Sequence, residues 1–185
     1  MTRFLPIRGI CHTCRHGFRK KLTFVPKDDK VTVCEIIIKL NYMEKILLSC
    51  PLLYLNGTVT NELLKGEKVI AVVVENTLMS LKNQIRMTYS GAERECENLT
   101  FADGHCGYLS LKKEFELWVS HREEINQTVQ VLRENGINAD FLPAGTVYWT
   151  AGGDKFYAPA VNASSGHTLK QDKGSYYVSR AAIGK

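Results

Sequence analysis

The first residues of the chain contain a pattern that can bind a metal. Cys11 and Cys14 lie in "CHTCRH", a CxxC pair that supplies two thiolates from one turn. A structural zinc site needs four thiolate or imidazole ligands in tetrahedral geometry, so two more ligands are required. Cys34 and Cys50 can complete the set, although neither belongs to a second CxxC pair. Two interpretations stay open: a zinc site in the N-terminal arm, or an arm without metal and a protein without a cofactor.

Residues of catalytic types are present, but none occurs in a catalytic motif. No nucleophile elbow, HExxH helix or phosphate-binding glycine loop includes Ser110, His105, His121, His167 or the pair Glu123–Glu124. "TAGGDK" lacks the glycine spacing of a P-loop and the Ser or Thr after its lysine. We therefore expect that the protein is not an enzyme.

Binding chemistry is concentrated near the C-terminal end, over residues 147–183. Seven of the chain's 17 aromatic residues lie between Phe141 and Arg180, among Gly, Ser, Asn and Lys. Tyr and Trp offer large contact areas with a polar edge, and the small polar residues supply turns. The alternation in "TVYWTA" predicts that Trp149 points into the core and Tyr148 points outward. The candidate ligand-binding residues are Tyr148, Asp154, Lys155, Phe156, Tyr157, His167, Lys170 and Lys173.

The charge divides the chain into an arm and a body. Residues 1–30 hold eight Lys or Arg and two Asp, whereas the remainder is nearly neutral and the whole chain carries +5. We expect a basic arm over residues 1–42, which is either a folded element or an upstream extension, and a main domain over residues 43–185. A nearly neutral body does not favour nucleic-acid binding by the main domain.

No apolar run reaches the roughly 20 residues that a membrane-spanning helix needs, so we expect no membrane insertion. The N-terminus lacks the apolar core of a signal peptide, so we expect synthesis in the cytoplasm, with a virion or cell-surface location left open.

Hydrophobic periodicity predicts a mixed fold. "KVIAVVVENTLMSLK" reads as a buried strand, a turn at Glu75–Asn76 and a second strand. Residues 88–99 and 110–135 carry helical spacing, with Ser110 as a candidate N-cap and Asn135–Gly136 as a stop. Strands at both ends with helices between them indicate a small α+β domain, in which two helices pack against short antiparallel sheets and the last strand pairs with an early one.

The order of short motifs between Tyr54 and Ile183 resembles the family named after the C-terminal domain of the Legionella collagen-like adhesin. The motifs are "LNGT" (55–58), "IAVVV" (70–74), "MTYSGAERECENL" (87–99), "GYLSLKKEFEL" (107–117), "IN" (125–126), "YWTA" (148–151) and "YYVSRAAI" (176–183). The chain departs from the family pattern at Tyr108, which stands for Trp, at Ser110, which stands for Pro, and at Ser179, which interrupts the final motif.

The resemblance implies a C-type-lectin-like domain that displays side chains from a long, irregular C-terminal segment. It predicts a non-catalytic recognition module, adhesin-like or phage receptor-binding-like, that contacts glycan or protein surfaces, such as a glycan or protein on a host. Homo-oligomer formation stays open. The alternative is an intracellular adaptor that is stabilised by zinc and contacts nucleic acid through its basic arm. Metal analysis separates the two.

Overall fold

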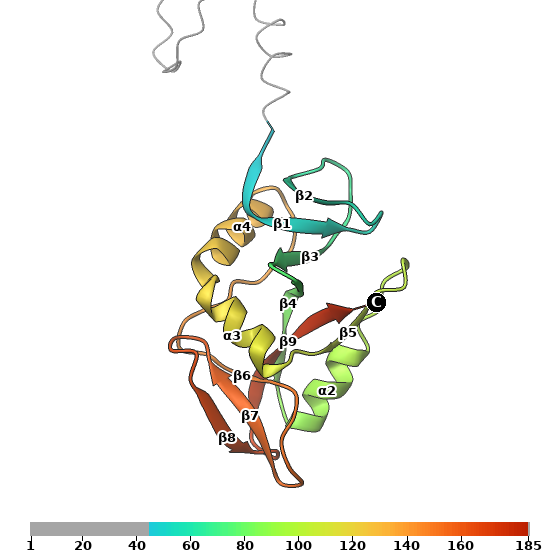
Figure 1. Ribbon diagram of the computed structural model, residues 1–185. Coiled ribbons are helices and arrows are strands. Elements are labelled where there is room, and N and C mark those ends of the chain that lie inside the picture. Colours follow the sequence, from blue (N-terminus) through green and yellow to red (C-terminus); the bar gives the residue numbers. More distant parts are fainter. Residues whose placement is uncertain (1–44, 185) are drawn as a thin grey trace, which may run out of the picture. The chain divides into compact units, whose positions relative to one another are not determined.

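The structure is a computed structural model that describes residues 45–184 (Figure 1). The predicted arm over residues 1–42 lies outside the described residues. The strands are β1 (Leu47–Tyr54), β2 (Val59–Glu62), β3 (Val69–Val74), β4 (Thr77–Met87), β5 (Cys106–Leu109), β6 (Val147–Trp149), β7 (Tyr157–Asn162), β8 (Thr168–Asp172) and β9 (Tyr177–Gly184). The helices are α2 (Tyr89–Glu97), α3 (Lys112–Ser120) and α4 (Arg122–Glu134).

The predicted α+β class is confirmed, and the strands form one nine-stranded, mostly antiparallel sheet. The strand order is β2-β1-β3-β4-β9-β6-β7-β8, and β5 pairs with β9 beside this path. The β-branched run of β3 and the predicted turn at Glu75–Asn76 form a hairpin with β4. The last strand, β9, pairs with the early strand β4 along one edge and with β5 and β6 along the other. The expected pairing of the last strand with an early strand is therefore confirmed.

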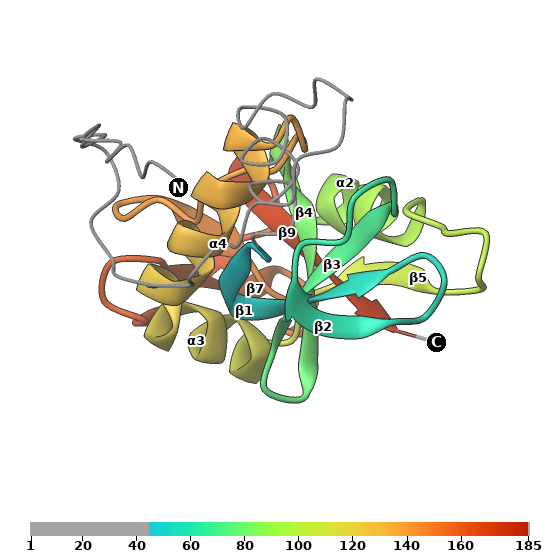
Figure 2. The same ribbon diagram turned by 90° about the horizontal axis from the view of Figure 1, so that it is seen from above.

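Helices cover both faces of the sheet, with α3 and α4 on one side and α2 on the other (Figure 2). Trp118 of α3 and Val129 of α4 belong to the same core cluster as the even-numbered β9 residue Ala182. Ala92 and Cys96 of α2 pack against the odd-numbered residues, such as Ala181. Because both faces are covered, strands near the middle of the sheet bury successive side chains instead of alternating between core and solvent.

Three helices are found among the described residues where two were expected, because the second predicted helix is interrupted at His121. This residue ends α3 and begins α4 with a non-helical backbone (φ −102°, ψ 21°). Neither Gly nor Pro marks the interruption, so no sequence signal predicts it. The prediction of Ser110 as N-cap was also wrong, because Leu111 occupies that position and the buried Ser110 hydroxyl has no hydrogen-bond partner among residues 45–184. The predicted stop is confirmed, since Asn135 caps α4 and Gly136 follows with a left-handed backbone (φ 79°).

A buried arginine joins the centre of the sheet to the segment that leads into β6. Arg180 of β9 is fully buried, and its guanidinium donates hydrogen bonds to four backbone carbonyls, those of Ser80, Leu81, Asp140 and Phe141. Burial lowers the pKa of Arg180 to about 10, which keeps the side chain protonated at neutral pH. The charge is therefore solvated by carbonyl dipoles of two chain segments that lie about forty and a hundred residues away in sequence.

We expect the substitution Arg180→Met to lower the free energy of unfolding by roughly 3–5 kcal/mol, because it leaves four carbonyls without their donor. The matched control is Arg86→Met, which changes an exposed arginine of β4 and should cost less than about 0.5 kcal/mol. Urea denaturation of both variants measures the difference. Equal stability of the two would show that the guanidinium does not hold this part of the fold.

Candidate functional site

A groove of about 580 Å³ lies on the C-terminal hairpin, next to the start of α3. The residues that line it are Lys112, Gly153, Asp154, Tyr157, Ala158, Pro159, Thr168, Leu169 and Lys170. Its volume falls within the range of small-molecule sites in proteins. Tyr157 and Leu169 remain about two-fifths exposed there (41% and 38%), so the groove keeps apolar surface in contact with solvent.

The loop between β6 and β7 gives this groove a fixed wall. Gly153 has a left-handed backbone (φ 106°), and a Cβ atom at this position would lie 2.2 Å from the carbonyl oxygen of Tyr157. The Asp154 carboxylate accepts hydrogen bonds from the backbone N–H groups of Phe156 (2.9 Å) and Tyr157 (2.8 Å). The backbone N–H of Gly152 donates to the Tyr89 hydroxyl at 3.0 Å, which ties the loop to α2. The loop conformation is therefore set before any ligand arrives.

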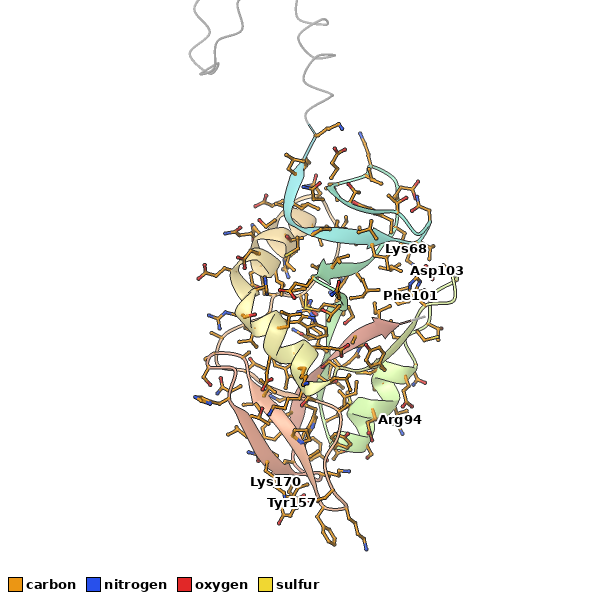
Figure 3. The ribbon with its side chains drawn as sticks, viewed as in Figure 1. Lys68, Arg94, Phe101, Asp103, Tyr157 and Lys170 are labelled. Carbon is orange, nitrogen blue, oxygen red and sulfur yellow. The ribbon has the colours of Figure 1, made fainter. Side chains whose placement is uncertain are left out.

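An ion pair and a cation–π contact meet inside the groove. The Lys170 ammonium lies 2.9 Å from Asp154 Oδ2 and 4.7 Å from the centre of the Tyr157 ring. Figure 3 shows the side chains of Lys170 and Tyr157 next to each other at one end of the domain. The hydrogen bond from Lys170, with the two backbone N–H groups, lowers the pKa of Asp154 to about 2. At the other rim, Lys112 pairs with Glu116 at 3.6 Å.

Two further lysines lie next to the groove, and neither forms an ion pair within residues 45–184. The Lys155 ammonium lies 5.3 Å from the Phe156 ring centre, and that ring is 62% exposed. The Lys173 ammonium lies 4.5 Å from the ring of Tyr89. The backbone N–H of Lys173 donates to the carbonyl of Phe156, so both lysines belong to one tip of the domain. We call Lys155, Phe156 and Lys173 the tip.

The structure brings six of the eight predicted ligand-binding residues together, in the groove and at the tip, and separates two. Tyr148 is fully buried in the core against Phe115, with ring centres 4.7 Å apart, so the prediction that it faces outward was wrong. Trp149 is also fully buried, as predicted, against Tyr89 on the opposite face of the sheet. His167 is exposed in the turn between β7 and β8, at the far end of the hairpin from the tip, and does not line the groove.

Of the four predicted zinc ligands, only Cys50 lies in the described part of the chain. It is 5% exposed in β1, and burial raises the pKa of its thiol. Cys11, Cys14 and Cys34 lie outside the described residues, so the zinc site stays a prediction. Within residues 45–184, no group of three or more His, Cys, Asp or Glu side chains is arranged to hold a metal ion. Cys96 and Cys106 are free thiols, the first buried and the second exposed.

The candidate ligand-binding residues taken from the sequence did not include Gly153, Pro159, Thr168 and Leu169, which also line the groove. The positions of Pro159, Thr168 and Leu169 follow from antiparallel pairing of β7 with β8, which sets Pro159 opposite Lys170. Strand pairing read from the two short runs "FYAPAVNA" and "HTLKQ" could have placed Pro159 beside Lys170. The steric need for glycine at position 153 depends on the approach of the backbone at residues 157–158, which no sequence pattern reveals.

No protein-family model matches the chain, and no curated protein sequence matches it either. Across the described residues, no helix has both the length and the apolar character that crossing a membrane requires.

We expect Gly153→Ala to destabilise the domain and to displace the loop, because its Cβ would collide with the backbone of residues 157 and 158. The matched control is Gly57→Ala, which also has a left-handed backbone (φ 81°) but meets no atom within 4 Å. The control should lower the free energy of unfolding by about 1–2 kcal/mol, from the strain of a left-handed alanine alone. Gly153→Ala should lower it by clearly more. Thermal melts of both variants test this, and equal losses would show that the close approach is not required.

The Asp154 carboxyl should titrate far below its ordinary pKa of 3.8, near 2, and its pKa should rise when Lys170 is replaced by Met. Because folding lowers this pKa, the associated stabilisation is present above pH 3.8 and is lost as the pH falls towards about 2. NMR titration of the Asp154 side-chain carboxyl in both proteins measures the change. The same pKa in both would mean that Lys170 does not hold the carboxylate.

Proposed function

We propose that the protein is a non-catalytic recognition module of C-type-lectin-like character, which binds glycans through the groove and the adjacent tip. The observation that carries the proposal is the groove itself, in which a preorganised loop presents Asp154 next to Tyr157 of β7 and to Leu169 and Lys170 of β8. Preorganised sites lose less conformational entropy on binding than flexible ones. An adhesin-like or phage receptor-binding-like role follows from the same site together with the motif order.

The chemistry of the groove favours binding over catalysis. Its only acidic lining residue is Asp154, whose carboxylate is engaged by Lys170 and by two backbone N–H groups. With its pKa near 2, this carboxylate is a weak general base at neutral pH. Aromatic rings and paired polar groups at a surface are the features that bind sugars, because a ring packs on C–H groups while polar groups satisfy hydroxyls.

A glycan array probed with the full chain tests the proposal, and two pairs of variants place the binding surface. Tyr157→Ala and Lys170→Ala should each weaken binding by about tenfold or more, because both residues line the groove. The matched controls Tyr176→Ala and Lys113→Ala change exposed residues outside the groove and should bind as the wild type does. All four variants should keep their stability to within about 1 kcal/mol.

Two results would contradict the proposal. The first is the absence of binding to any glycan, and the second is equal binding by the groove variants and their controls. Binding only to a protein surface would keep the recognition role and reject glycans as the ligand.

A further inference from the structure

The charges of the groove are already neutralised by the protein. Of its nine lining residues three are charged, and each belongs to an ion pair, Lys170 with Asp154 at 2.9 Å and Lys112 with Glu116 at 3.6 Å. An anionic ligand would have to displace Asp154 from Lys170 or bind beside its negative charge. Lys155 and Lys173 of the tip, which do not line the groove, form no ion pair with the residues that the structure describes. The net charge of +5 therefore does not describe the groove.

The Asp154–Lys170 pair remains accessible and offers both kinds of hydrogen-bonding group. The two side chains are 52% and 68% exposed. A carboxylate only accepts hydrogen bonds and an ammonium only donates them, whereas a hydroxyl does both. Neighbouring hydroxyls can therefore bond to Asp154 and Lys170 together while the ion pair stays intact. A sulfate or carboxylate cannot donate to Asp154 and is repelled by it.

Apolar side chains lie beside this polar pair. Tyr157, Pro159 and Leu169 line the same groove, and the Lys170 contact and the backbone bonds of Asp154 hold the position of Tyr157. A pyranose ring has the matching arrangement, with C–H groups on its faces and hydroxyls at its edges. We infer that the groove binds an uncharged pyranose unit of a glycan, with its C–H groups against Tyr157 and Leu169 and adjacent hydroxyls bonded to Asp154 and Lys170. This inference rests on the proposed function and names its ligand class.

The test is a glycan array in which each neutral oligosaccharide is printed beside sulfated, sialylated and uronate-bearing forms of the same backbone. The wild-type chain should bind neutral forms at least as well as their charged counterparts. Binding to the best neutral form should change by less than about twofold between about 0.05 M and about 0.5 M salt, because no net charge is neutralised in the complex.

Asp154→Asn gives the sharper result, because it should change the specificity. The amide oxygen can still accept from the N–H groups of Phe156 and Tyr157, so the loop is retained, but Lys170 loses its partner. Binding to the neutral form should fall about tenfold, and salt-sensitive binding to the charged forms should increase. The matched control Asp172→Asn removes the same charge from an exposed residue outside the groove. It should leave binding to the neutral form and binding to the charged forms unchanged. If Asp154→Asn does not fold, Lys170→Met replaces it, and it should lose neutral binding without gaining charged ligands.

The outcomes separate this inference from the proposed function. Binding confined to charged glycans, with strong salt dependence in the wild type, overturns the neutral ligand and leaves the recognition role standing. Absence of binding to every glycan overturns both. Unchanged specificity in the folded Asp154→Asn variant also overturns the inference, because the ion pair would then have no part in selection.

Discussion

The buried Arg180 guanidinium is the constraint on which the rest of this structure depends. It lies in β9, the strand that pairs with β4, β5 and β6. Its hydrogen bonds hold the segment around residues 140–141 against residues 80–81 of β4. That segment leads directly into β6, and β6 leads through the Gly152–Gly153 turn to the groove. A charge buried without a carboxylate partner is tolerated only when carbonyl dipoles surround it. The positions of these four carbonyls are therefore fixed together with the arginine.

Coverage of both sheet faces by helices decides which aromatic side chains stay exposed. Near the middle of the sheet, Tyr148 packs under α3 and Trp149 packs under α2, so neither ring is free. The hairpin of β7 and β8 lies at the end of the strand order, where β8 has a neighbour on one edge only. Exposed side chains such as Tyr157 and Lys170 are found there (Figure 3). The candidate site thus lies where the layered core ends.

Charge at the site differs from the charge of the chain. The whole positive excess comes from residues 1–30, and the lysines within the groove are paired. The tip, in contrast, combines Lys155 and Lys173 with aromatic rings. A ligand that extends from the groove to the tip would meet a surface of paired charges first and a cationic surface next. Specificity would then depend on the ion pairs within the groove rather than on the net charge of the chain.

The sequence by itself determined the elements whose signals are local. The β-branched run of β3, the helix stop at Asn135–Gly136 and the concentration of Asp154, Tyr157 and Lys170 in one loop-rich stretch all follow from neighbouring residues. The tertiary structure alone decided that Tyr148 is buried and that the helix breaks at His121. It also decided that Lys170 forms an ion pair, whereas Lys155 forms none with the described part of the chain. The physical reason is that burial and ion pairing depend on which distant segments come together. Phe115 covers Tyr148 from thirty-three positions away in sequence, and Asp154 reaches Lys170 only because β7 and β8 pair.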